Sequence, residues 1–191
     1  MRSIYKFIFF NILGWSLEYR CAKDVSGSAM VIVAPHTSFY DGFIGKLGLL
    51  LVGWKHLLLS APWLFKSPMM PIMKLIGAIP VEGPKSIFKV VKRLKENDGT
   101  KIVICPEGQL AKTDEWNPGF FYMARKANVP IIVVTLNYKT KTIIFKDIID
   151  TDELSQYSAK TIMIAVKSLY NDSDTYAKYP EKFELPNKSK Y

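Results

Sequence analysis

The sequence contains little cysteine and little histidine. Among its 191 residues there are 2 cysteines, Cys21 and Cys105, and 2 histidines, and no C-x-x-C pair is present. A structural zinc site takes about four closely spaced Cys or His ligands; because the two cysteines lie far apart and only two histidines are present, we expect no zinc cluster. Two distant cysteines without a pairing motif are typical of reduced thiols in a protein that faces the cytosol.

The sequence also lacks an apolar run long enough to span a membrane. The stretch SIYKFIFFNILGW is apolar for about a dozen residues and is interrupted by Lys6, whereas a spanning helix needs about 20. No small-residue cleavage site follows it, which disfavours a signal peptide. Two alternatives remain for residues 1–20: an amphipathic helix at a membrane surface, or a helix folded onto its own domain. The surface helix would use the apolar residues Ile4, Phe7, Ile8, Leu13 and Trp15 and the basic residues Arg2, Lys6 and Arg20.

Acidic residues are too few to balance the basic ones. There are 17 Asp and Glu against 26 Lys and Arg, for a net charge of +9. Such a charge favours an anionic partner: nucleic acid, a membrane surface or a phosphorylated substrate. The basic run KVVKRLK (89–95) is typical of the solvated face of an amphipathic helix, and no nucleic-acid-binding motif accompanies it. We therefore expect a membrane partner and no nucleic acid.

The remaining composition indicates one folded domain. Hydrophobic residues make up 49% of the chain, and no repeat or long linker divides it. The expected boundaries are an N-terminal membrane-associating helix (1–20), a folded domain (21–170) and a polar C-terminal tail (171–191). The final 20 residues carry no functional signal.

Strands and helices are expected to alternate along the folded domain. The segments 30–35 and 129–138 are expected to be buried strands, 100–108 a buried strand that runs into a loop, and 141–149 an edge strand. Helices are expected at 41–52, 85–97, 117–128 and 153–170. The apolar segment 56–81 is cut by prolines, which predicts short pieces around a groove. This order predicts a single layered α/β domain with a mostly parallel central sheet flanked by helices.

The stretch PHTSFYD (35–41) holds a histidine and a carboxylate five residues apart, His36 and Asp41. On a continuous helix such residues point about 140° apart, and on an extended strand they lie roughly 16 Å apart. A direct contact therefore requires a turn between them. With such a turn, Asp41 would fix the imidazole tautomer and the other ring nitrogen would accept a proton from a hydroxyl.

A structural alternative exists for the same stretch. SFYD (38–41) fits the helix-start pattern in which Ser38 is the N-cap and Asp41 lies in the first turn. The two interpretations are compatible, because capping would also place Asp41.

Four blocks in order resemble the glycerolipid acyltransferase family. They are PHTSFYD, IGAIPVEG (76–83), CPEGQLAK (105–112) and VPIIVV (129–134), and the likeness extends over about residues 4–150. The chain is most similar to the small bacterial enzymes that resemble lysophosphatidic acid acyltransferase. The stretch EWNPGFFYMARKANVPI (115–131) looks especially like the short members.

The resemblance implies transfer of an acyl group from acyl-CoA or acyl carrier protein to a lipid hydroxyl, without a metal or bound cofactor. It implies that His36 is the general base and Asp41 the carboxylate that orients it. It also implies that Glu107 and Gly108 begin the block that builds the acceptor site. The enzyme would act at the cytoplasmic face of a membrane as a peripheral or monotopic protein.

The chain departs from the family pattern where the acceptor's phosphate would bind. Arginines are expected at the positions of Gly83 and Leu110, and Gln109 also differs from the family's E-G-T-R block. Arginine grips phosphate bidentately, and lysine is not equivalent. Two lysines, Lys85 and Lys112, lie two residues beyond the lost arginines and are candidate substitutes.

Two interpretations follow from these departures. Either the His–Asp pair works on a changed acceptor, or the chain is a noncatalytic lipid-binding or membrane-tethering protein with the same fold. The presence of His36, Asp41 and Glu107 together favours the enzyme. A serine hydrolase is disfavoured because no G-x-S-x-G motif is present.

Overall fold

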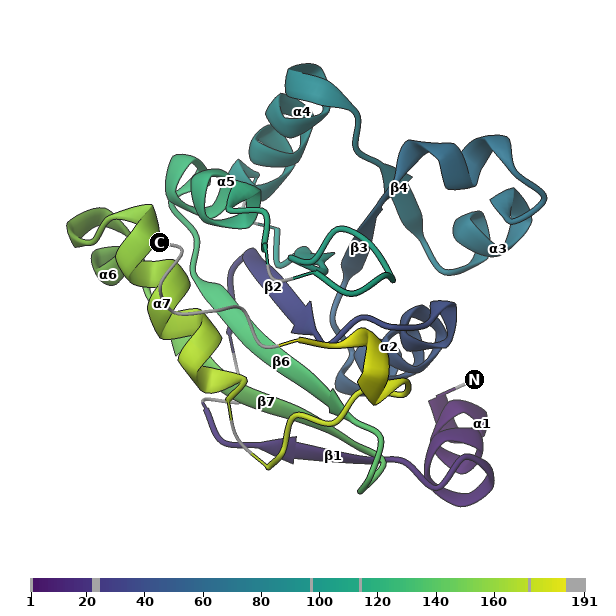
Figure 1. Ribbon diagram of the computed structural model, residues 1–191. Helices are drawn as coiled ribbons and strands as arrows, with labels where there is room; N and C mark the ends of the chain where they lie inside the picture. The colour runs from purple at the N-terminus through teal and green to yellow at the C-terminus, as the bar shows by residue number, and fades with distance from the viewer. Residues whose placement is uncertain (1, 22–24, 97, 114, 172, 185–191) are drawn as a thin grey trace.

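The computed structural model describes residues 2–21, 25–96, 98–113, 115–171 and 173–184. Residues 185–191 of the predicted tail lie outside this range. The strands form one sheet in the order β1-β7-β6-β2-β5-β3-β4. Every neighbouring pair is parallel except β6 and β7, which are antiparallel. The predicted α/β domain with a mostly parallel sheet is therefore confirmed (Figure 1). The strands are β1 (Ser16–Tyr19), β2 (Ala29–Ala34), β3 (His56–Ser60), β4 (Ala78–Pro80), β5 (Lys101–Ile104), β6 (Ile131–Asn137) and β7 (Thr142–Ile149).

Helical segments cover both faces of this sheet. The longer ones are α2 (Phe39–Val52), α4 (Gly83–Lys95), α5 (Gly119–Ala127) and α7 (Ala159–Leu169). The shorter ones are α1 (Arg2–Lys6), η1 (Phe7–Ile12), η2 (Pro62–Lys66), α3 (Met70–Leu75), α6 (Thr151–Gln156) and η3 (Pro180–Lys182). Among the described residues, no helix is both long enough and apolar enough to cross a bilayer.

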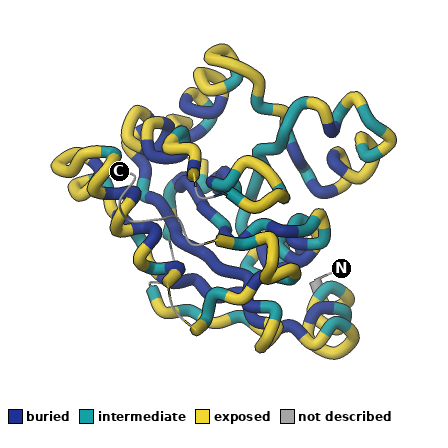
Figure 2. Tube along the Cα trace, in the orientation of Figure 1, coloured by how far each residue is buried: buried dark blue, intermediate teal, exposed yellow. Residues whose placement is uncertain are grey.

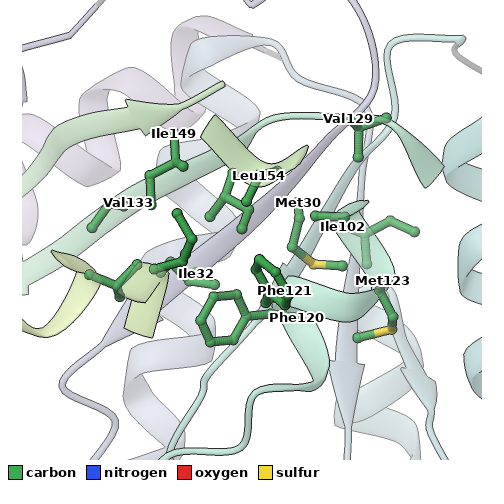
Figure 3. Close-up of a cluster of buried hydrophobic side chains, with 14 of the residues drawn as sticks. Met30, Ile32, Ile102, Phe120, Phe121, Met123, Val129, Val133, Ile149 and Leu154 are labelled. Carbon is green, nitrogen blue, oxygen red and sulfur yellow. The ribbon is translucent and has the colours of Figure 1, made fainter. Parts of the chain in front are cut away.

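Alternate residues of the central strands enter two separate cores. Met30 and Ile32 of β2 pack with α4, α5, α6 and α7 (Figure 3), whereas Val31 packs with α2 and the N-terminal helix. This division follows from the two-residue period of a strand, which sends successive side chains to opposite faces. Both faces are covered, so the central strands are buried along nearly their whole length (Figure 2).

The N-terminal segment is folded onto its own domain, and some of its apolar residues remain exposed. The helix ends at Ile12, and Gly14 adopts a positive φ of 68° that redirects the chain into strand β1. Phe9 is fully buried against the core, while Ile4 and Phe7 are 62% and 60% exposed. Of the residues that the surface-helix alternative would expose, Trp15 is instead buried in the α2-side core, and Ile8 and Leu13 are partly buried against it.

Two further expectations differ from the structure, and a third is confirmed. The segment 141–149 is not an edge strand, because β1 pairs with the outer side of β7. The segment 153–170 is two helices rather than one, each beginning at its own capping residue, Asp150 and Ser158. The segment 56–81 does break into short pieces, as its prolines predicted, but two of these pieces are strands.

Tyr170 ties the last helix to the central sheet. It is fully buried, and its hydroxyl donates to the backbone oxygens of Ile32 at 3.2 Å and Val134 at 3.0 Å. These oxygens belong to β2 and β6, close to the strand ends from which the candidate site is built. The hydroxyl therefore joins α7 to the strands that position the site.

We expect Tyr170→Phe to lower the free energy of unfolding by about 1–2 kcal/mol, because a buried hydrogen-bond donor is removed and its acceptors are left short of partners. Urea denaturation measures this change. Tyr122→Phe is the control, since Tyr122 is 57% exposed and should change little. Equal stability of the two variants would contradict the anchoring role.

Candidate active site

The loop between β2 and α2 brings His36 and Asp41 together. The distance from His36 Nδ1 to Asp41 Oδ2 is 3.1 Å. Helix α2 begins with a capping box, in which the Ser38 side chain accepts from the first turn and the Asp41 side chain accepts from the Ser38 backbone N–H. The predicted turn and the predicted cap are both confirmed, and the cap is what holds Asp41 beside the histidine.

The Asp41 carboxylate is the centre of a hydrogen-bond network. Only 4% of the residue is exposed, and Oδ2 accepts from the backbone N–H groups of Thr37 and Ser38, both at 2.9 Å. The Tyr138 hydroxyl donates to Oδ1. With these donors fixed, Nδ1–H of His36 is the natural fourth donor, which leaves Nε2 free to accept a proton.

Tyr138 is a site residue that the sequence analysis missed. It follows β6 at the same edge of the sheet where His36 follows β2. Burial and the nearby Asp41 carboxylate raise the pKa of the Tyr138 hydroxyl, so it remains a donor. Its position after a buried strand was a usable signal, but only the strand order places it beside Asp41.

Glu107 forms a hydrogen bond with the backbone of His36. Its Oε1 accepts the backbone N–H of His36 at 3.0 Å, and its Oε2 is shielded from solvent with no hydrogen-bond partner among the described residues. Burial raises the pKa of Glu107 to about 7, against the opposing effect of the His36 hydrogen bond. The hydrogen bond with Glu107 therefore positions the backbone of His36, whereas Asp41 positions its ring.

The two histidines have different environments. Burial lowers the pKa of His36, but interactions with Cys105 and with the Asp41 carboxylate outweigh it and raise this pKa well above 6.5. Burial lowers the pKa of His56, whose Nδ1 pairs with the backbone oxygen of Trp54 at 2.7 Å. His36 is therefore the more basic imidazole of the two.

The other predicted site residues are not joined to this network. Gly108 makes a turn with φ of 68°, and Gln109 donates to the backbone oxygens of Ala111 and Lys112, both at 3.5 Å. Lys112 pairs with Glu184 at 3.1 Å on the surface, and Lys85 is exposed in the first turn of α4. Within the described part of the chain, none of the side chains of Gln109, Lys85 and Lys112 hydrogen-bonds to the His–Asp pair.

The C-terminal segment packs back against the site. The Tyr138 N–H donates to the backbone oxygen of Tyr176 at 2.9 Å, and the Tyr179 N–H donates to Thr37 Oγ1 at 3.2 Å. Lys178 Nζ lies 4.1 Å from the centre of the Tyr40 ring. The yellow end of the chain accordingly lies beside α2 (Figure 1), which the polar composition of residues 171–191 did not indicate.

An apolar pocket lies between α2 and the sheet, and His36 and Asp41 line it. Three glycines spaced three apart on α2, Gly42, Gly45 and Gly48, form part of its wall. A Cβ atom at Gly45 would meet no atom within 4 Å, so this position leaves room in the pocket. The rest of the lining is mostly aliphatic or aromatic and comes from the sheet, α2, η2 and α3: Val31, Val33, Phe39, Leu49, Leu58, Leu59, Leu64, Met73, Ile76, Val103, Val134, Leu136, Ile143 and Phe145.

No group of three or more His, Cys, Asp or Glu side chains in the described ranges is arranged to hold a metal ion. The chemistry available is a hydrogen-bonded imidazole with one free nitrogen, facing an apolar pocket. Such a site suits proton transfer next to a hydrophobic substrate.

Comparison with known proteins gives the class to which this fold and site belong. The model of the acyltransferase family matches residues 17–137, so the chain belongs to the acyltransferase family. The structure resembles the crystal structure of the 1-acyl-sn-glycerophosphate acyltransferase PlsC of Thermotoga maritima, with a TM-score of 0.55 and 15% sequence identity over 90% of this chain and 78% of that one. At this identity the likeness shows the fold. No curated protein sequence matches the chain.

We expect the two histidines to titrate on opposite sides of 6.5, with His36 above and His56 below. The imidazole proton signals in NMR spectra recorded against pH measure both values in one sample. Asp41→Asn should lower the pKa of His36 by removing the negative charge beside the ring and leave that of His56 unchanged. A His36 pKa unaffected by this substitution would contradict the pairing.

Proposed function

We propose that the protein transfers a fatty acyl group from acyl-CoA or acyl carrier protein to a hydroxyl of a lysophospholipid-like or other lipid acceptor. The observation that carries the proposal is the His36–Asp41 pair, 3.1 Å apart, on the wall of an apolar pocket. Membership of the acyltransferase family supports the general activity.

His36 acts as the general base in this proposal. A thioester is already activated toward attack, so the main remaining task is to remove the acceptor's hydroxyl proton as the oxygen attacks. The Asp41 carboxylate accepts a hydrogen bond from Nδ1–H of His36, which orients the ring and stabilises the imidazolium that forms. The acyl chain would lie in the apolar pocket, where Gly45 of α2 leaves space for it.

The acceptor site lacks the two arginines that would bind a phosphate in the related enzymes. Gly83 and Leu110 occupy those positions. Of the candidate substitutes, Lys112 is engaged with Glu184 and Lys85 is a solvent-exposed residue at the start of α4. We therefore propose that the acceptor range extends beyond phosphate-bearing lipids to uncharged or differently charged ones.

The proposed location is the surface of a membrane, on its cytoplasmic side. Exposed apolar residues of the N-terminal helix and of α2 gather on the pocket side of the sheet, where a lipid acceptor would enter; they are Ile4, Phe7, Phe10, Ile12, Phe39 and Phe43. Large apolar patches exposed on a protein are typical of sites that bind a partner or a membrane.

His36→Ala should lower the transfer rate by about 10²–10⁴-fold, because the general base is lost, and Asp41→Ala should lower it as well. The assay supplies labelled acyl-CoA or acyl carrier protein with a panel of lysophosphatidate, other lysophospholipids, monoacylglycerol and lyso-aminolipids. Circular dichroism and vesicle binding are the controls for folding. If the wild-type protein is folded and binds vesicles but forms no product with any donor–acceptor pair, the result would favour the noncatalytic lipid-binding alternative.

The transfer rate of the wild-type protein should rise with pH above 6.5. The base must be unprotonated to act, and the pKa of His36 is raised, so the active fraction grows until pH passes that value. Initial rates across this range, at saturating acyl donor, measure the effect. A rate that falls over the same interval would contradict the assignment of His36 as base.

Replacing Ile4 and Phe7 together by Ser should weaken binding to anionic vesicles by about 10-fold or more, because apolar area no longer enters the interface. The matched control replaces Tyr122 and Ile164, which are 57% and 39% exposed on helices of the opposite face. Vesicle sedimentation measures both. Equal loss in the two double variants would argue against a specific membrane-facing surface.

A further inference from the structure

The two short helices η2 and α3 carry an exposed apolar surface of their own, separate from that of the N-terminal segment. Leu75 is 80% exposed and Trp63 is 59% exposed. We call the surface the η2–α3 surface, and its members are four large apolar residues and two lysines: Trp63, Met70, Ile72, Leu75, Lys66 and Lys74. None of these six side chains lines the pocket or belongs to the cores on the two faces of the sheet.

The inner side of the same helices is apolar as well. Leu64, Met73 and Ile76 pack in a small core and line the pocket that contains His36 and Asp41. A helix at the surface of a water-soluble domain normally has one apolar face and one polar face. Because η2 and α3 are apolar on both sides, their outer side is suited to a second apolar environment.

The charge at the η2–α3 surface is positive. The range 42–81 contains no Asp or Glu, and neither Lys66 nor Lys74 forms an ion pair within the described residues. Tryptophan and lysine together are typical of segments at the boundary between hydrocarbon and headgroups. An anionic bilayer offers an apolar interior to the large side chains and a negative surface to the lysines.

Helix α3 lies close to the helix that carries the catalytic carboxylate. A Cβ atom on Gly42 would lie 3.6 Å from Cδ1 of Ile76, and Gly42 directly follows Asp41 in α2. Helices α1, α2 and α3 lie along one side of the view in Figure 1. The η2–α3 surface therefore belongs to helices that border α2, whose Phe39 and Phe43 are also exposed.

We propose that the η2–α3 surface binds an anionic lipid bilayer, and that apolar substrates pass between this bilayer and the pocket beside η2 and α3. The second part rests on the proposed acyltransferase function, whereas contact with a bilayer requires no chemistry. With the N-terminal helix as the other contact, the domain would be held at two places, which fixes its orientation on the membrane and turns the pocket toward the lipid.

Trp63 makes the contact directly measurable. Of the four tryptophans in the chain, Trp15 and Trp116 are buried and Trp54 is half-buried. Vesicles of phosphatidylglycerol and phosphatidylcholine with brominated acyl chains quench tryptophans that enter the bilayer. We expect quenching in the wild-type protein and loss of most of it in Trp63→Phe, which should still bind. Unchanged quenching in vesicle-bound Trp63→Phe would overturn the proposal.

Replacing Ile72 and Leu75 together by Ser should weaken vesicle binding about 10-fold or more. The matched control replaces Ile87 and Phe88 by Ser. These side chains are 40% and 64% exposed, against 48% and 80% for Ile72 and Leu75, and they lie on α4, which packs on the opposite face of the sheet. Equal loss in the two double variants, both folded by circular dichroism, would overturn the proposal.

The lysines and the possibility of a second copy of the chain are tested separately. Lys66→Gln combined with Lys74→Gln should weaken binding to phosphatidylglycerol vesicles about 10-fold and leave binding to phosphatidylcholine vesicles unchanged. Equal loss with both lipids would contradict the role of charge. Sedimentation velocity without lipid should show a monomer. A wild-type dimer that the Ile72 and Leu75 double variant dissociates would assign the surface to self-association and overturn the proposal.

Transfer assays distinguish this proposal from the proposed function. The Ile72 and Leu75 double variant should lose about 10-fold in transfer to a long-chain acceptor in vesicles and keep its rate with short-chain substrates in solution. Equal loss with both substrates would overturn the route into the pocket. Quenching at Trp63 without transfer by the wild-type protein would support the surface and contradict the acyltransferase function. Transfer without any vesicle binding would do the reverse.

Discussion

The buried carboxylate of Asp41 is the interaction on which the site depends. It is part of the capping box at the start of helix α2, and it accepts hydrogen bonds from the N–H groups of Thr37 and Ser38 in the preceding loop. It also orients His36 and accepts a hydrogen bond from the hydroxyl of Tyr138, which follows β6. A carboxylate can be buried without a large cost only when several donors surround it. The same donors that stabilise its charge therefore fix the geometry that the imidazole requires.

The parallel sheet explains why these residues meet. Strands β2, β5 and β6 are parallel neighbours, so the segments that follow them, with His36, Glu107 and Tyr138, emerge at one edge. This is the edge at which ligands bind in open α/β sheets. Tyr170 bonds to β2 and β6 near these ends, and Glu107 holds the His36 backbone. The site is consequently supported by the sheet, by two loops and by the last helix at the same time.

The polar groups occupy only part of a pocket that is otherwise apolar. Helix α2 has glycine at three positions along the pocket; at Gly45 the absence of a Cβ leaves open space, whereas Gly48 allows close packing of Ile143. The exposed apolar side chains of α2 and the N-terminal helix lie on the same side of the sheet. The His–Asp pair, the apolar pocket and these exposed side chains thus all depend on one helix and its neighbours.

The sequence by itself predicted the α/β class, the central strands and the cap at Ser38, and it showed that a contact between His36 and Asp41 requires a turn, because each depends on local periodicity or on spacing of a few residues. It did not determine that 141–149 lies inside the sheet, since the pairing of β1 with β7 joins segments more than 100 residues apart. Tyr138, the partners of Glu107 and the return of the C-terminal segment to the site were likewise decided only by the tertiary structure. The physical reason is common to all of them. Strand order and long-range packing bring together residues that are far apart in the sequence, and a local sequence pattern does not indicate which distant residues it will contact.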